Sequence, residues 1–256
     1  MARYPELAGK VAIVTGGSTG IGKAIARDLA QEGVKVMITA RQNRERAEQA
    51  VSELRAEGGE VAYVIGDAAK KSDVEQLVRE TEQKFGPVDI LVNNAGGFKQ
   101  RGPVWELSEE EWDDVINSNL KSAYLCTVAV LPAMVQRGWG RIINVSSESG
   151  RMPVVKLAAH YSASKAGMIG FSKHVALEVA GTGVTVNATA PATTWSERVQ
   201  GVYGGDEARK MIESKAPMGR LAMPEEQAPI VTFLCSNGAS YINGATIDVA
   251  GGKVMI

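Results

Sequence analysis

The sequence predicts an α/β fold: one doubly wound domain, with a parallel sheet of about seven strands and helices on both of its faces. Short β-branched runs alternate with longer helical patterns along all 256 residues, which is typical of this class. Apolar runs such as VAIV and DILV do not alternate with polar residues, as expected of strands buried on both sides. No linker, repeat or low-complexity tract interrupts the pattern, so a single domain is expected over residues 1–256.

The alternation places seven strands and six helices in order along the chain. Strands are expected at 11–15, 35–39, 61–65, 89–92, 141–145, 184–187 and 246–249. Helices are expected near 21–32, 43–57, 72–85, 109–136, 161–180 and 225–236. Capping or first-turn residues mark three of the helix starts, at Asp73, Ser108 and Pro224.

Composition excludes several classes of protein. The net charge of −1 provides no overall field that would attract nucleic acid or an anionic membrane. Only Cys126 and Cys235 are present, without a CxxC or Cys/His cluster, so two reduced thiols are expected rather than a disulfide framework or a metal site. Residues 1–6 contain no signal-peptide pattern, and no apolar run approaches the ~18 residues of a membrane span. A cytoplasmic protein is expected.

A glycine-rich turn follows the first predicted strand and opens the first predicted helix, within TGGSTGIG at 15–22. Gly16 permits the tight turn, Gly20 lets the backbone approach a ligand, and Gly22 allows close packing of the helix on the strand. The start of the helix offers free N–H groups and a partial positive charge to a pyrophosphate. Because the turn begins a βαβ unit, it predicts dinucleotide binding rather than an ordinary turn.

The end of the second strand indicates which dinucleotide binds. An NAD site usually places Asp or Glu there for the ribose 2′-hydroxyl, whereas this chain has Ala40-Arg41, with Arg44 one turn further. A guanidinium is suited to a 2′-phosphate, although a charge in solvent at the helix start is the alternative. NADP(H) is therefore predicted in preference to NAD(H).

Tyr161 and Lys165 are placed four residues apart in YSASK at the start of a predicted helix, so they share one face. Lowering the pKa of a phenol from ~10 to ~7 requires about 4 kcal/mol of preference for the phenolate, which a neighbouring ammonium can supply. Tyr161 can then pass a proton to or from an oxygen that gains or loses hydride.

Three further polar positions lie where strands or helices would place them near the same edge. Ser147 ends the predicted strand GRIINVSS and can hydrogen-bond a developing oxyanion, with a satisfied turn hydroxyl as the alternative. NNAG at 93–96 also ends a strand and could be a simple turn. Asn119 lies inside a helical pattern, where Asn is unfavourable, so it either caps a kink or holds a water.

Taken together, these motifs resemble the short-chain dehydrogenase/reductase family, in the branch that carries YxxxK, and the likeness covers nearly the whole chain. The resemblance implies a Rossmann-like domain with a cofactor half at about 1–150 and a catalytic and substrate half at about 140–256. It implies a catalytic tetrad of Asn119, Ser147, Tyr161 and Lys165. It also implies cofactor contacts from Gly16, Ser18, Thr19, Gly20, Ile21, Gly22, Arg41, Asp67, Ala68, Asn94, Ala95, Gly96, Tyr161, Lys165, Pro191, Thr194 and Ser196.

The resemblance implies an NADP(H)-dependent oxidoreductase acting on the carbonyl or alcohol carbon of a small molecule, and a homotetramer. The alternatives are a 3-oxoacyl-thioester reductase and a non-catalytic NADP-binding sensor; an enoyl reductase would have a wider Tyr–Lys spacing. Docking arginines for an acyl carrier protein are replaced by Gly138-Trp139 and Thr182, which favours free small substrates. Pro191-Ala192 replaces the usual Pro-Gly. Five potentially cationic side chains are expected at the mouth of the site, where they either point to solvent or favour anionic substrates: Lys99, Arg101, Arg151, Lys156 and His160.

Overall fold

The computed structural model describes residues 2–98, 102–154 and 156–256. Its centre is a seven-stranded parallel sheet with the order β3-β2-β1-β4-β5-β6-β7. The strands are β1 Val11–Val14, β2 Lys35–Ala40, β3 Val61–Ile65, β4 Ile90–Asn93, β5 Gly140–Val145, β6 Val184–Pro191 and β7 Thr246–Val249. The strand order reverses between β1 and β4, and ligands bind at such a switch point, beyond the carboxyl ends of the strands.

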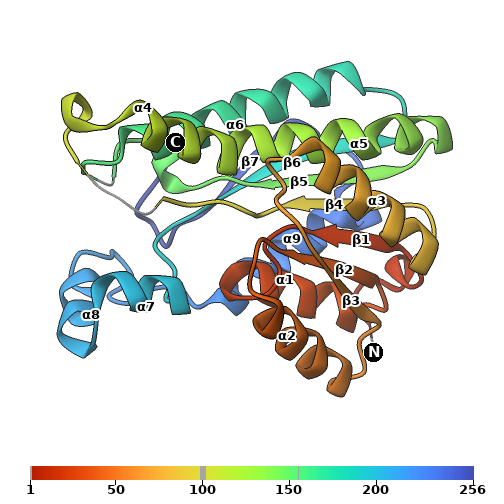
Figure 1. Ribbon diagram of the computed structural model, residues 1–256, viewed down its shortest axis with the longest axis horizontal. Coiled ribbons are helices and arrows are strands. Elements are labelled where there is room, and N and C mark those ends of the chain that lie inside the picture. The colour runs from red at the N-terminus through yellow and green to blue at the C-terminus, as the bar shows by residue number, and fades with distance from the viewer. Residues whose placement is uncertain (1, 99–101, 155) are drawn as a thin grey trace.

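Helices cover both faces of the sheet (Figure 1). One layer contains α1 Gly20–Gln31, α2 Arg44–Ala56 and α9 Pro224–Cys235, while the other contains α3 Lys71–Phe85, α4 Glu109–Ile116, α5 Ser122–Arg137 and α6 Ala159–Glu178. Each layer has its own apolar core against the sheet, the first including Ile25, Leu29 and Leu234 and the second Met134 and Ile142. The predicted doubly wound fold is confirmed.

Three features differ from the prediction by more than one or two residues at an end. Residues 109–136 form two helices, because a π-helical turn at Asn117–Lys121 separates α4 from α5. Strand β6 continues to Pro191, beyond the predicted 187, because residues 188–191 pair with β7 and the first two of them also pair with β5. The short helices α7 Glu197–Tyr203 and α8 Asp206–Glu213 were expected as loop.

The predicted helix starts are explained by local contacts. Ser108 and Glu111 form a capping box at α4, and Pro224 is the first residue of α9. Asp73, in the first turn of α3, accepts a hydrogen bond from the amide of Asp67. Across the described ranges, no helix is both long enough and apolar enough to cross a bilayer.

Candidate active site

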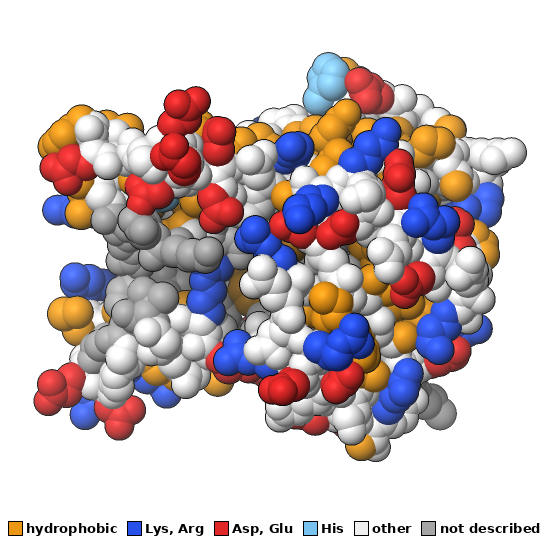
Figure 2. All heavy atoms as spheres, in the orientation of Figure 1, with side chains coloured by type: hydrophobic (Ala, Val, Ile, Leu, Met, Phe, Trp, Pro, Cys, Tyr) orange, Lys and Arg blue, Asp and Glu red, His pale blue; other side chains and the backbone are white. Residues whose placement is uncertain are grey.

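A cavity of about 910 Å³ lies at the carboxyl ends of the central strands. In the space-filling view, the surface is hollowed between the α7–α8 segment and the body of the molecule (Figure 2). The cavity brings together most of the residues predicted for the site: Gly16, Ser18, Thr19, Gly20, Ile21, Gly22, Arg41, Asn94, Ala95, Gly96, Ser147, Tyr161, Lys165, Pro191, Thr194 and Ser196. Asp67 and Ala68 lie outside this lining, and Asn119 lies behind it.

The glycine-rich turn between β1 and α1 is shaped for a close ligand. Gly16 and Gly20 have φ of +64° and +52°, which disfavour a side chain. A Cβ on Gly22 would lie 2.3 Å from the carbonyl oxygen of Gly16 and 2.4 Å from Nδ2 of Asn94, so only glycine fits between turn and helix. Asn94 Nδ2 donates to the carbonyls of Thr15 and Gly16, at 2.9 and 3.2 Å. The turn is therefore held in place by its neighbours, and its backbone forms the floor of the cavity.

The start of α1 has the properties of an anion site. Thr19 at the N-cap makes no side-chain capping hydrogen bond. The amide of Gly20 donates instead to Oε2 of Glu197, at 3.1 Å, from the distant helix α7. A carboxylate thus lies at the position where helix N–H groups and the helix dipole favour a phosphate. These features fit a dinucleotide pyrophosphate at this turn.

At the far end of the cavity, two arginines follow β2. Arg41 lines the cavity and is half exposed, and its Nε pairs with Asp67 at 3.0 Å. Arg46 also lines the cavity, a residue that sequence reasoning missed. Arg44 points elsewhere, because its guanidinium donates to the hydroxyl of Tyr63 at 3.1 Å. Arg41 and Arg46 are the cations available to a ribose 2′-phosphate.

The catalytic side chains come from the end of β5 and the first turns of α6. Tyr161 and Ser147 share a hydrogen bond between their hydroxyls. Lys165 Nζ donates to the carbonyl of Val145 at 2.8 Å and lies 5.8 Å from the centre of the Tyr161 ring. Phe98 packs against that ring at 4.7 Å between centroids. The predicted grouping of Ser147, Tyr161 and Lys165 at one edge of the sheet is present.

Burial controls the protonation of this cluster. It lowers the pKa of Lys165 to about 7, with a smaller contribution from the positive charge of Arg198. It raises the pKa of Tyr161, against the opposing influence of the Ser147 hydrogen bond and Arg198. The expectation that Lys165 lowers the pKa of Tyr161 is therefore not met by the protein alone. Tyr161 is held protonated, in the form that donates a proton.

Comparison with known proteins agrees with this geometry. The family model described as short chain dehydrogenase matches residues 10–204. The chain belongs to the short-chain dehydrogenase family. It is 41% identical over 250 residues to a 3-oxoacyl-[acyl-carrier-protein] reductase of Synechocystis sp., covering 97% of this chain and 98% of that one. It is 39% identical over 254 residues to dehydrogenase/reductase SDR family member 4 of Bos taurus, covering 99% and 90%.

A solved structure shows the same fold. A tryptophan variant of actinorhodin polyketide ketoreductase with NADPH superposes with a TM-score of 0.89 and 38% identity, covering 98% of each chain. The predicted membership of the short-chain dehydrogenase family is confirmed.

In this short-chain dehydrogenase, Asn119 lies at the π-helical turn that divides α4 from α5. Its side chain is fully buried; Oδ1 accepts from the amide of Gly97, while Nδ2 donates to the carbonyls of Gly97 and Val115, all at 2.8 Å. Asn119 therefore fixes the backbone after β4 and adjusts the helix locally, as π-helical turns near functional sites commonly do.

The predicted cluster of cations is wrong for the members that the structure describes. Arg151 makes two hydrogen bonds to Asp248, each of 2.9 Å. Lys156 lines a separate cavity, and His160 is buried. Lys99 and Arg101 lie outside the described residues.

Arg198, which sequence reasoning missed, also brings a guanidinium into the cavity. Its guanidinium donates to the carbonyls of Gly96 and Phe98, 102 and 100 residues away. It covers Gly97, where even a Cβ would collide with it. The one local signal was Ser196-Glu197, a helix start within a segment that was expected as loop.

Proposed function

We propose that the chain is a ketone reductase that transfers a hydride between NADP(H) and the carbonyl or alcohol carbon of a small molecule. The observation that carries this proposal is the Ser147–Tyr161–Lys165 cluster in the same cavity as the glycine-rich turn. Dinucleotide binding alone does not require a buried tyrosine hydroxyl, so a non-catalytic sensor explains less. The similarity to a ketoreductase solved with NADPH supports both the reaction and the cofactor.

The cofactor residues have separable roles in this proposal. The backbone of the glycine-rich turn and the start of α1 would hold the pyrophosphate, after Glu197 has moved away. Arg41 and Arg46 would hold the 2′-phosphate, Asn94 keeps the turn in shape, and the segment from Pro191 through Ser196 would line the nicotinamide side. Asp67 orients Arg41. The bound cofactor supplies the hydride.

The proton transfer follows from the catalytic cluster. Ser147 would donate a hydrogen bond to the carbonyl oxygen of the substrate, fixing it beside Tyr161. Tyr161 donates its proton to that oxygen as negative charge develops there. Ser147, through its hydroxyl, and the positive charge of Arg198 then stabilise the phenolate. In the reverse direction the same phenolate accepts the proton of an alcohol.

The proposal is tested by NADPH oxidation with a panel of ketones, diketones, quinones, sugars and 3-oxoacyl thioesters. Turnover with at least one ketone is expected, whereas NADPH binding without turnover of any carbonyl compound would indicate a sensor. A carrier-linked thioester is the second candidate substrate, because relatives named 3-oxoacyl-[acyl-carrier-protein] reductase are 41% and 39% identical to this chain. Comparing the same 3-oxoacyl group on carrier protein and on a short thiol separates the two candidates.

The cofactor preference is tested at Arg41. Arg41→Ala should weaken NADPH binding by about 10–100-fold through loss of a charge-assisted phosphate contact, and leave NADH binding unchanged. Arg44→Ala is the matched control, because the guanidinium of Arg44 is hydrogen-bonded to the hydroxyl of Tyr63. Equal affinity of the wild type for NADPH and NADH would contradict the assignment.

A homotetramer in the cytoplasm completes the proposal. Exposed apolar side chains on the outer helices support assembly: Tyr124, Val128 and Val135 on α5 and Leu177 on α6. Light scattering should give about four times the chain mass of 27.2 kDa, and a mass near 27.2 kDa would refute it. Both cysteines are buried and free, as suits a reducing compartment.

A further inference from the structure

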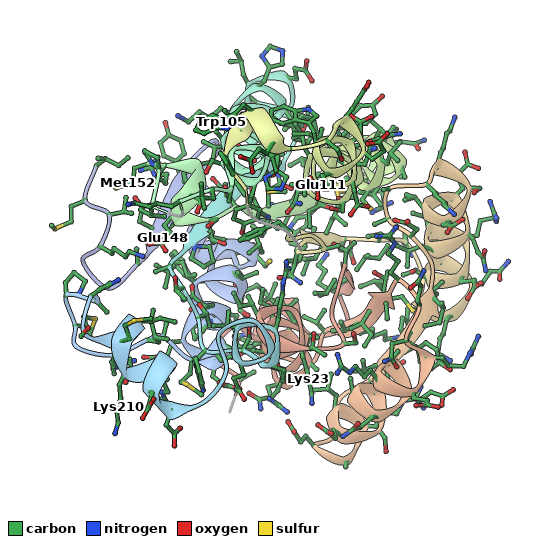
Figure 3. All side chains as sticks on the ribbon, turned by 60° about the vertical axis from the view of Figure 1, so that its left-hand side comes forward. Lys23, Trp105, Glu111, Glu148, Met152 and Lys210 are labelled. Carbon is green, nitrogen blue, oxygen red and sulfur yellow. The ribbon has the colours of Figure 1, made fainter. Side chains whose placement is uncertain are left out.

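A buried carboxylate directly follows the catalytic serine. Glu148 begins the short helical turn Glu148–Gly150 after β5, its side chain is 3% exposed, and it lines the same cavity as Ser147 and Tyr161. In Figure 3, Glu148 lies inside the molecule, on the side toward α8 and away from α2. No step of the proposed reaction uses this side chain.

The two oxygens of Glu148 have different surroundings. Oε1 accepts from Nζ of Lys253 at 2.8 Å and from Oγ1 of Thr193 at 3.3 Å. Oε2 is buried and has no hydrogen-bond partner among the described residues, and the same is true of Oγ of Ser149, which also lines the cavity. The turn after Ser147 thus holds two buried polar atoms without partners, on two residues of the cavity wall.

Such an arrangement is unfavourable unless something else completes it. Buried polar atoms are nearly always hydrogen-bonded, and leaving a charged one unsatisfied costs more than leaving a neutral one. Lys253 already balances the charge of Glu148, so the missing partner is a hydrogen-bond donor rather than a second cation. A purely structural role, in which Glu148 holds the C-terminal segment through Lys253, would explain the contacts of Oε1. It would not explain why Oε2 is buried without a partner.

We propose that Glu148 is a specificity-determining residue, whose Oε2 accepts a hydrogen bond from a hydroxyl group of the substrate close to the reacting carbonyl. The inference rests on the proposed ketone reduction, in which Ser147 holds the carbonyl oxygen. Adjacent residues have Cα atoms only ~3.8 Å apart, so a group bound by Glu148 lies within a few bonds of that oxygen. The preferred substrates are therefore hydroxyketones rather than plain ketones, and a further negative charge on the substrate is disfavoured.

The test compares hydroxyacetone with methoxyacetone, which differ by the donor hydrogen. With NADPH, the wild type should show a kcat/KM for hydroxyacetone about 10–100-fold above that for methoxyacetone. Glu148→Val should bring the ratio close to 1 while NADPH affinity stays unchanged. Lys253→Met is the control: it breaks the ion pair and lowers the melting temperature, but it keeps Oε2 and the preference for the hydroxyl.

Binding gives a second readout that does not need turnover. Calorimetric titration of both ketones into the complex with NADP⁺ should show the same preference, lost in Glu148→Val. Preferential binding without NADPH oxidation would support Glu148 while the proposed reaction fails. Turnover of both ketones with a ratio near 1 in the wild type, or an unchanged ratio in Glu148→Val, would overturn the role of Glu148 and leave ketone reduction intact.

Discussion

The glycine-rich turn and the catalytic cluster lie in one cavity but are built in opposite ways. The turn, residues 15–22, is defined by bare backbone: Gly22 has no room for a Cβ, and the amide of Gly20 donates to Glu197. The cluster consists of side chains, among which burial raises the pKa of Tyr161 and lowers that of Lys165. Ser147 follows β5, whereas Lys165 lies in α6. The Nζ of Lys165 donates to the carbonyl of Val145 at the end of β5.

The difference explains which part tolerates substitution. In the turn, a single methyl group added at Gly22 would collide with Gly16 and Asn94. In the cluster, Phe98 packs against the ring of Tyr161, and burial shifts the pKa values of Tyr161 and Lys165. Substitutions in the turn are therefore expected to change cofactor affinity, whereas substitutions in the cluster are expected to change turnover and its pH dependence.

Tyr161→Phe should have the largest effect. It keeps the ring and removes the transferable proton, so kcat should fall by at least ~10²–10⁴-fold with NADPH affinity nearly unchanged. Tyr241→Phe is the control, because Tyr241 is fully exposed. Residual activity above about a tenth of the wild type would assign the proton to another group.

Lys165→Met should abolish turnover yet stabilise the fold at neutral pH. The pKa of Lys165 is about 7 in the folded chain and ~10.4 in the unfolded chain. Between these two pH values, only the unfolded chain holds the proton. The stability of the wild type therefore rises with pH in this range. The penalty is fully present below pH 7 and is at most about 5 kcal/mol.

Urea unfolding at pH 6.5 and pH 9.5 measures this effect. Lys165→Met should exceed the wild type in unfolding free energy at the lower pH, and the gap should shrink at the higher pH. Lys173→Met, on an exposed position of the same helix, should show no such pH-dependent gap. A gap that is constant with pH would mean that burial does not perturb Lys165.

Gly22→Ala should weaken NADPH binding by about 10–100-fold, because the added methyl group would lie within 2.4 Å of atoms in the turn and of Asn94. Gly170→Ala is the matched control, since Gly170 also lies in a helix and has open space at its Cβ. Fluorescence titration of NADPH measures both. Comparable affinities in the two variants would show that the turn adapts and that its bare backbone is dispensable.

Glu197→Gln should have the smallest effect, and in the opposite direction. Removing the negative charge at the start of α1 should tighten NADPH binding by about 3–10-fold, because the phosphates no longer compete with a carboxylate. Glu207→Gln, in the first turn of α8, should leave affinity unchanged. Weaker binding in Glu197→Gln would instead make Glu197 a cofactor ligand.

The sequence by itself determined the sheet, the order of its main helices and the residues of the turn and cluster. These features depend on local periodicity, on glycines that only a tight turn requires, and on the spacing of Tyr161 and Lys165 along one helix face. The strands were predictable because parallel strands buried on both faces read as unbroken apolar runs, although β6 extends four residues beyond its predicted end. The functional residues that follow such strands could be found in the same way.

Only the tertiary structure decided how charges are distributed around the cleft. Arg151 is hydrogen-bonded to Asp248, which is 97 residues away in the sequence. Arg198 donates to the carbonyl of Gly96, which is 102 residues away. Glu148 is joined to Lys253 over 105 residues. A long charged side chain can reach several partners, and which one it meets depends on the packing of distant segments, so no local pattern in the sequence could specify these contacts.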